Sequence, residues 1–347
     1  MNKYFTIMLI LNQIKKLNGE RSTNSILHIL NGKRSSQTII DIQLYDLSSY
    51  FGLYEKLTRN DFEQMVQLMT TNHWITNDKN AVLTLEGEQA LTNFNINQRI
   101  PSTLNGWQYH HLEANVFNRF MLLTQVLSNI SYNNKNYIPI VKDKWLQLQI
   151  KQLLVHVEKK QFSKQFYEQL TKCCMEISKV IDPSFIVIHL SGYEKSGKTF
   201  LQAAQMFNME LDEYIINFKG ALHAFLHEII HHKMDYPILY DLIAIDEISP
   251  ITKSTLQTEQ LLNEGYSLED ISKLRSLKLS TVEDHLVELA MFRENFSIEN
   301  YVSNDLKKKI VNASANLQTK KLKRIKEEVQ EASYIQIRLS LAEGAKK

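Results

Sequence analysis

The stretch 255–289 constrains the fold most, because it carries the start and stop signals of three short helices. Gly265 suits the left-handed backbone position that commonly ends a helix. Ser267, with Asp270 three residues later, is an N-cap signal for a second helix. The apolar stripe expected on that second helix comprises three residues: Leu268, Ile271 and Leu274.

A third helix is expected to be capped by Ser280, where Glu283 would complete a capping box. Its apolar positions recur at helical spacing: Val282, Leu286 and Leu289. Its other face would offer polar side chains to a partner: Thr281, His285 and Glu288. This succession predicts a helix-turn-helix, whose last helix enters the major groove in DNA-binding versions.

The acidic residues of the last helix favour a second hypothesis. Glu283, Asp284 and Glu288 would repel phosphates, so a helix-turn-helix that binds protein remains an alternative. The same helix has no Arg, and Asn295 follows only beyond its end. It therefore offers little for base-specific reading, which disfavours a sequence-specific transcription regulator.

Composition extends the helical expectation to the whole chain, since 347 residues contain only five prolines and ten glycines. This length allows two or three domains. A net charge of +2 means that any basic surface is local. The adjacent Cys173 and Cys174 cannot form a CxxC metal knuckle and fit a reducing cytoplasm. Residues 4–11 are apolar but too few to span a membrane.

The patterns predict a mostly α-helical fold in three consecutive domains: 1–98, 101–248 and 249–347. The first shows three helical patterns and then two short β-rich runs around an Asn/Asp turn, which predicts a winged helix. The middle domain shows helical patterns, including a second helix-turn-helix over residues 200–232, and its core candidates are Trp145, Leu148 and Leu153. The last contains the helix-turn-helix described above.

Two parts of the chain resemble modules of RecQ-type helicases. The N-terminal part resembles their RQC winged helix at Gly19-Glu20-Arg21, Leu30-Asn31-Gly32-Lys33, Tyr50-Phe51-Gly52 and Leu83-Thr84-Leu85-Glu86-Gly87. Residues 255–286 and 333–339 resemble the helix-turn-helix appended to some of those helicases. A chain that combines both modules without a helicase motor is similar to the YpbB family of Firmicute proteins. This resemblance implies a DNA-binding role tied to a separately encoded RecQ-type helicase.

Residues 192–199 match the full P-loop pattern, in which Lys198 would reach phosphates and Thr199 would hold Mg²⁺. Residues 185–190 would be the preceding strand, and residues 242–247 resemble a Walker B strand. The alternative is a turn between helices, with Thr199 as an N-cap. We favour the turn, because too few strands are indicated for a nucleotide-binding sheet.

Residues 227–231 match the HExxH zincin pattern on an expected helix. However, His223, His227 and His231 form an i, i+4, i+8 stripe that is equally typical of an amphipathic face. Met234 stands where the metzincin pattern requires glycine, although a distant Glu ligand is an alternative. We therefore expect no catalytic metal site, no cofactor and no enzymatic activity.

Residues 305–326 carry eight basic side chains and a single acid, Asp305, which makes them the preferred phosphate-contact surface. The alternative is a solvated helix face. The C-terminal candidates for DNA contact are Lys278, Ser280, Thr281, His285, Lys307, Lys308, Lys309, Lys320, Lys321, Lys323 and Arg324. The N-terminal candidates are Arg21, Lys33, Arg34, Arg59 and the wing residue Lys79.

These interpretations predict a cytoplasmic, nucleoid-associated protein that binds forked or single-stranded DNA and assists a RecQ-type helicase in repair or recombination. Basic groups would hold the phosphate backbone while the helical modules fix orientation. The alternative function is a protein adaptor that does not bind DNA directly.

Overall fold

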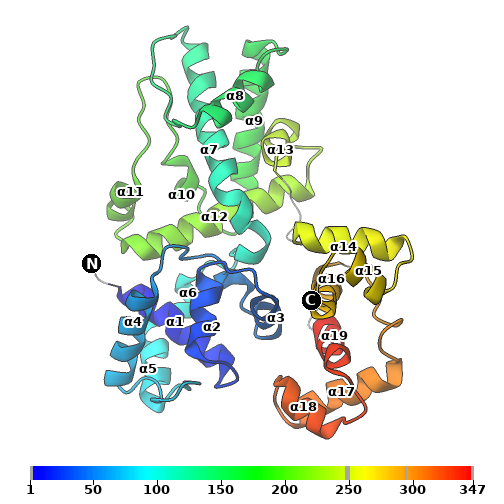
Figure 1. Cartoon of the computed structure of the whole chain (residues 1–347). Helices are drawn as coiled ribbons and strands as arrows, with labels where there is room; N and C mark the ends of the chain where they lie inside the picture. Colours follow the sequence, from blue (N-terminus) through cyan, green and yellow to red (C-terminus); the bar gives the residue numbers. More distant parts are fainter. Residues whose placement is uncertain (1–2, 247–250, 294, 345–347) are drawn as a thin grey trace. The chain divides into compact units, whose positions relative to one another are not determined.

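The computed structural model describes residues 3–246, 251–293 and 295–344, and these residues are mostly α-helical (Figure 1). The chain groups into two compact units. Unit 1 comprises residues 1–9 and 91–248, and unit 2 comprises residues 10–90 and 249–347. This grouping divides the expected first domain, while the division into three independent domains stays a prediction.

Unit 1 is built around helix α7 (Gly106–Ser131), which packs against four neighbours. The neighbours are α8 (Lys144–Leu153), α9 (Lys159–Ile177), α12 (Leu211–His231) and α13 (Pro237–Ala244) (Figure 1). Asn105 caps α7 by accepting a hydrogen bond from the Gln108 N–H. The remaining helices are α6 (Ile96–Arg99), α10 (Ser184–Val187) and α11 (Phe200–Met206).

Helix α8 buries a different face from the expected one. Trp145 and Leu148 were core candidates, but both are exposed, and Trp145 keeps 66% of its surface accessible. The buried residues are Leu146 and Ile150, one helical turn apart on the opposite side. The expectation for Trp145 and Leu148 is therefore wrong, because hydrophobicity alone does not say which face packs.

The first helix, α1 (Tyr4–Leu17), is buried more completely than an amphipathic helix would be. Every residue from Phe5 to Ile14 is buried, including the polar Thr6, Asn12 and Gln13. A helix that is buried on all sides belongs to a core. The polar members have partners of their own: the Asn12 amide donates to the Tyr50 hydroxyl at 2.9 Å.

The expected winged helix is not confirmed. After α2 (Thr23–Leu30), α3 (Ser36–Leu44) and α4 (Arg59–Thr71), the two β-rich runs meet in one isolated antiparallel bridge between Ile75 and Leu83. No strand forms within the described residues. Only two backbone hydrogen bonds join the two runs before α5 (Leu85–Phe94) begins, which is too few to extend a β-ladder.

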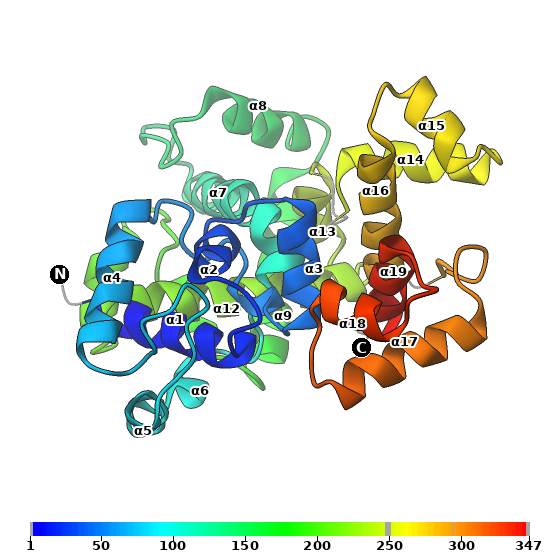
Figure 2. The same ribbon diagram turned by 60° about the horizontal axis from the view of Figure 1, so that its bottom comes forward.

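The C-terminal part of unit 2 contains the expected helix-turn-helix, α14 (Lys253–Asn263), α15 (Leu268–Leu274) and α16 (Leu279–Phe292). Three further helices follow it: α17 (Asn304–Asn316), α18 (Leu322–Glu328) and α19 (Tyr334–Gly344). Figure 2 shows α19 beside α16, and α19 also contacts α17 and α18. Helix α3 packs on both α16 and α19 within the same unit.

Gly220 of α12 yields a stability prediction. A Cβ at this position would lie 2.5 Å from Pro101 Cβ, and the proline ring is not free to move aside. We expect Gly220→Ala to destabilise the protein by about 1–3 kcal/mol, measured by denaturant unfolding. Gly344→Ala is the control, since nothing lies within 4 Å of its added Cβ. Equal unfolding free energies for the two variants would contradict the packing shown here.

Candidate nucleic-acid interface

A buried carboxylate fixes the first helix of the motif to the last. Glu288 of α16 is 3% exposed and accepts hydrogen bonds from the Thr252 N–H at 2.8 Å and the Thr255 hydroxyl at 2.5 Å. It also accepts from the Thr252 hydroxyl at 3.1 Å. Because Thr252 is the N-cap of α14, the negative charge lies at the positive end of that helix.

A second polar contact is centred on Thr258 of α14. The Arg275 guanidinium donates to the Thr258 oxygen and to the Ser254 carbonyl. The Thr258 hydroxyl also lies 2.8 Å from His285 Nδ1, and a neutral imidazole can accept the hydroxyl hydrogen at this nitrogen. Burial lowers the pKa of His285, and the charge of Arg275 lowers it further. His285 is therefore a neutral part of the interior.

These contacts correct the expected recognition face. His285 and Glu288 were expected to face a partner, yet they are 7% and 3% exposed and bind α14. Only Thr281 of that expected set remains partly accessible. The reason is that α14 and α3 both cover α16, which leaves mainly its first turn accessible.

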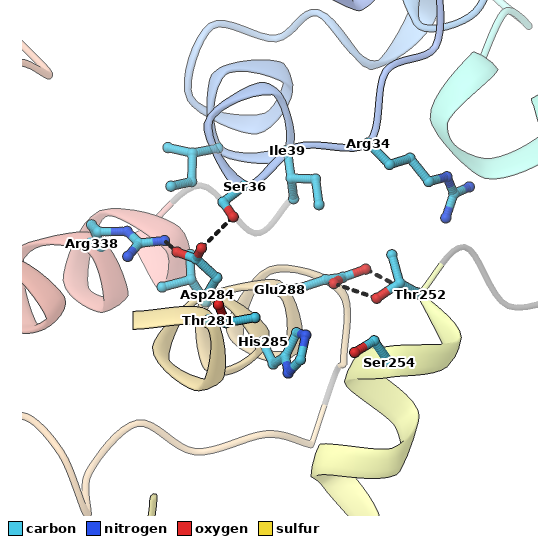
Figure 3. A pocket seen from close by; sticks show the side chains of 12 residues that line it. Arg34, Ser36, Ile39, Thr252, Ser254, Thr281, Asp284, His285, Glu288 and Arg338 are labelled. Carbon is cyan, nitrogen blue, oxygen red and sulfur yellow. Dashed lines mark hydrogen bonds and ion pairs between the residues drawn. The ribbon is translucent and has the colours of Figure 1, made fainter. Parts of the chain in front are cut away.

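Two of the three acidic residues of α16 have hydrogen-bond partners inside the protein. Asp284 accepts from Arg338 of α19 and from the Ser36 hydroxyl at the start of α3 (Figure 3). With Glu288 also buried, Glu283 is the one member of the acidic trio in the described structure without such a contact. Of the three, mainly Glu283 would therefore repel a DNA phosphate, which weakens the argument against DNA binding.

The residues around Asp284 line a small cavity of about 240 Å³. Figure 3 shows Ser36, Asp284 and Arg338 converging on one side and Glu288 meeting Thr252 on the other. This volume is below the roughly 300–1,000 Å³ of small-molecule sites. Its central charged groups, Asp284 and Arg338, already bind each other. The cavity therefore lies at a packing contact between helices of unit 2.

The caps of the motif agree with the sequence in two places and differ in one. Gly265 has φ +90°, and Ser267 caps α15 by accepting from the Asp270 N–H at 3.1 Å, as expected. Ser280 was expected to cap the third helix, but α16 begins at Leu279 with Lys278 as its N-cap. Ser276 takes a left-handed conformation, which tightens the turn before α16, and the helix begins one residue before Ser280.

The apolar stripe of α15 is also narrower than expected. Ile271 is fully buried, whereas Leu274 is 60% exposed. Leu279 at the start of α16 and Tyr266 before α15 are exposed as well. The turn of the motif thus presents apolar side chains next to the exposed Lys278 and Ser280.

The basic run of residues 305–326 divides into paired and unpaired cations. Lys307 pairs with Glu343, Lys309 pairs with Glu331 at 2.9 Å, and Lys321 donates to the Gly19 carbonyl. Lys320 lies over the Tyr45 ring, and burial lowers its pKa. In the described part of the run, three exposed cations have neither an ion pair nor a hydrogen bond: Lys308, Lys323 and Arg324.

Two of the N-terminal candidates bind carboxylates, and the other three are exposed. Arg21 donates to the buried Asp41 at 2.8 Å and lies over the Tyr45 ring, so its guanidinium is structural. Arg59 pairs with Glu63 one turn along α4. Lys33, Arg34 and Lys79 are exposed, and Arg34 also lies over the Phe51 ring.

The P-loop match at residues 192–199 is a turn with no place for phosphates. Thr199 caps α11 in a capping box with Gln202, which confirms the turn interpretation. The backbone N–H groups that would cradle a phosphate donate within the protein instead. They belong to Gly192, Tyr193, Lys195, Gly197, Lys198 and Thr199. A P-loop would need strands at residues 185–190 and 242–247, but residues 184–187 and 237–244 are helical, and residue 247 lies outside the described residues.

The histidines of the HExxH match have structural partners. His223 is fully buried, and its Nε2 lies 2.8 Å from Glu113 while its Nδ1 accepts from the Asn105 N–H. His227 Nδ1 lies 3.0 Å from the Tyr109 hydroxyl. Glu228, the would-be general base, accepts from the Tyr236 hydroxyl at 2.9 Å. Among the described residues, no cluster of three or more potential metal ligands forms.

Sequence reasoning missed the arginines that assemble the motif. Arg275 binds α14, Arg293 pairs with Glu259 of α14 through two 2.8 Å hydrogen bonds, and Arg338 binds Asp284. Their partners lie 17 to 54 residues away in the chain. No local pattern reports contacts over such separations.

Comparison with known proteins identifies the C-terminal part and relates the whole chain. Residues 254–341 match a family model described as a helix-turn-helix domain. The chain is 30% identical over 344 residues to "Protein YpbB" of Bacillus subtilis (strain 168), covering 97% of each protein. No solved structure matches it. Neither description names an enzymatic activity, and none of the described helices has both the length and the apolar character to cross a membrane.

Removal of the Glu288 carboxylate tests the clamp between α14 and α16. We expect Glu288→Ala to lower the free energy of unfolding by about 2 kcal/mol, because the buried Thr255 hydroxyl and two half-buried donors of Thr252 lose their acceptor. Glu283→Ala on the same helix is the matched control and is expected to stay within about 0.5 kcal/mol. A loss of similar size in both variants, measured by urea unfolding, would refute the clamp.

The neutral state of His285 predicts a pH dependence. Because its pKa is lowered in the folded protein, its contribution is complete above the ordinary value of 6.5 and is lost as the pH falls below it. The loss amounts to at most about 1.4 kcal/mol per pH unit. His285→Asn keeps an acceptor for Thr258 but does not titrate. Lowering the pH from 7.5 to 5.5 should therefore reduce the free energy of unfolding of this variant less than that of the wild type. Parallel curves would rule out this assignment.

Proposed function

The chain belongs to the YpbB family, and on this premise we propose that it is a DNA-binding accessory protein that assists a RecQ-type helicase. The helix-turn-helix domain at residues 254–341 is the observation that carries the DNA-binding part. The helicase part is supported by the resemblance of residues 255–286 and 333–339 to a module of those helicases.

The unpaired cations of unit 2 support contact with the phosphate backbone. Lys308 lies on α17, and Lys323 and Arg324 lie on α18, all of them exposed. A cation without an ion pair can contact a phosphate without first breaking an internal contact. These three residues are therefore the proposed positioning contacts, with Lys278 at the turn of the motif as a fourth.

The burial of α16 favours binding that is independent of base sequence. Eight residues of this helix are buried, including His285 and Glu288. A helix that reads bases needs several side chains free to enter the groove, and here the accessible part is mainly the first turn. We therefore assign this surface to DNA structure and orientation rather than to sequence.

The exposed apolar residues at the turn of the motif supply a place for the helicase. Leu274 and Leu279 lie on either side of the tight turn between α15 and α16, and both are exposed. Apolar side chains gathered on a surface are typical of a protein interface. The same observation favours the alternative function, a protein adaptor that does not itself bind DNA.

Charge reversal separates these two functions. We expect replacement of Lys308, Lys323 and Arg324 by Glu to weaken binding to labelled duplex and forked DNA and to reduce the salt slope by about one per lost contact. Replacement of Lys159, Lys160 and Lys164, all exposed on α9, by Glu makes the same change in net charge and is the control. Binding is measured by fluorescence anisotropy across a salt series.

The helicase is tested in parallel by co-elution of the full chain with a purified RecQ-type helicase. Leu274→Ser is expected to weaken co-elution and to leave DNA affinity unchanged. Wild type that binds no DNA but co-elutes in a Leu274-dependent way would replace the proposal by the adaptor function. Absence of both interactions would reject both functions.

A further inference from the structure

A pair of stacked tyrosines, the exposed Tyr132 and the half-buried Tyr193, lies in unit 1, far in the sequence from the helix-turn-helix. The rings of Tyr132 and Tyr193 are 4.6 Å apart between centroids, with an interplanar angle of 19°. Tyr132 nevertheless keeps 66% of its surface accessible. Since one face lies against Tyr193, the accessible surface of Tyr132 includes its other face.

Polar side chains of α7 hold both loops that carry these rings. The Ser128 hydroxyl accepts from the Tyr193 N–H at 2.9 Å. The side-chain oxygen of the buried Asn129 accepts from the Asn134 side-chain amide at 2.7 Å, and its backbone carbonyl accepts from the Asn134 N–H at 2.9 Å. Gln125, also buried, donates to the Ile138 carbonyl and accepts from the Ile140 N–H. The pair is therefore preorganised, although it lies at the surface.

The two loops are also basic. Residues 132–144 and 192–199 contain five lysines and two acids, Asp143 and Glu194. Asp143 is used as the N-cap of α8, and Glu194 hydrogen-bonds to the Tyr193 hydroxyl. In the described structure of these loops, the lysines are exposed and form no ion pair: Lys135, Lys142, Lys144, Lys195 and Lys198. The open aromatic face thus belongs to loops whose lysines are not neutralised by an ion pair.

We propose that this surface, defined by Tyr132, Tyr193 and the five lysines, binds single-stranded DNA. Stacking on tyrosine requires an unpaired base, because the faces of paired bases are covered in a duplex, and it tolerates any base. The lysines attract the flexible backbone. The surface does not suit a nucleoside triphosphate, since the N–H groups of the P-loop-like turn donate within the protein. The inference rests on the proposed DNA-binding function. It adds a second binding site, in unit 1, that takes the single-stranded form of DNA.

The test compares Tyr132 variants of the full chain in their affinity for a labelled oligothymidylate. Tyr132→Ala is expected to weaken binding by about fivefold or more, while Tyr132→Phe, which keeps the ring, stays within about twofold. Tyr167→Ala on α9 is the matched control, since Tyr167 is 67% exposed and lies outside these loops. Lys195→Gln should weaken binding and reduce its salt slope. Circular dichroism and thermal unfolding verify that each variant folds.

Three outcomes would overturn the inference: no effect of Tyr132→Ala, an equal loss in Tyr132→Phe, or an equal loss for duplex DNA. An oligouridylate arm identifies the strand chemistry, and binding confined to oligouridylate would also overturn it. Failure of the proposed function is separate, because it is read from duplex binding by the Lys308, Lys323 and Arg324 variant. A Tyr132-dependent single-strand affinity would persist in that variant.

Discussion

The helix-turn-helix of this protein depends on a carboxylate that is almost completely buried. Glu288 accepts from the backbone and hydroxyl donors at the start of α14, where the first N–H groups of a helix have no acceptor within the helix. Thr258 and His285 repeat this arrangement one turn further along α14. An apolar seam would pack equally tightly but would fix the register of the helices less specifically, because hydrogen bonds are directional.

Local signals in the sequence were reliable where one residue determines the backbone. Gly265, Ser267 and Thr199 mark helix boundaries where the structure has them, because caps and left-handed turns act over three or four residues. The family resemblance was confirmed as well. The wrong assignments concern orientation: His285 and Glu288 face inward because α14 covers them, and Trp145 faces outward because Leu146 and Ile150 pack instead. Periodicity defines faces and leaves open which one meets a partner.

The basic run shows how far charge in a sequence differs from charge available to a ligand. Lys307, Lys309 and Lys321 are held by internal acceptors, and Lys320 lies over an aromatic ring. Their work is structural: Glu20 accepts from the Thr319 hydroxyl at 2.8 Å and from the Lys320 N–H at 3.1 Å, which joins this segment to the N-terminal part of unit 2. Within this run, only Lys308, Lys323 and Arg324 keep their charges free of internal acceptors in the described structure. This agrees with a protein of nearly balanced net charge.

The composition of unit 2 has a consequence for the order in which the protein forms. Its two segments, residues 10–90 and 249–347, are separated by the whole of residues 91–248. During synthesis, helices α2 and α3 leave the ribosome long before α16 and α19, the helices on which α3 packs. Unit 2 is therefore completed only after residues 249–347 have been synthesised, and until then α3 lacks its partners α16 and α19. During that interval the unpaired N-terminal segment is exposed to chaperones and proteases.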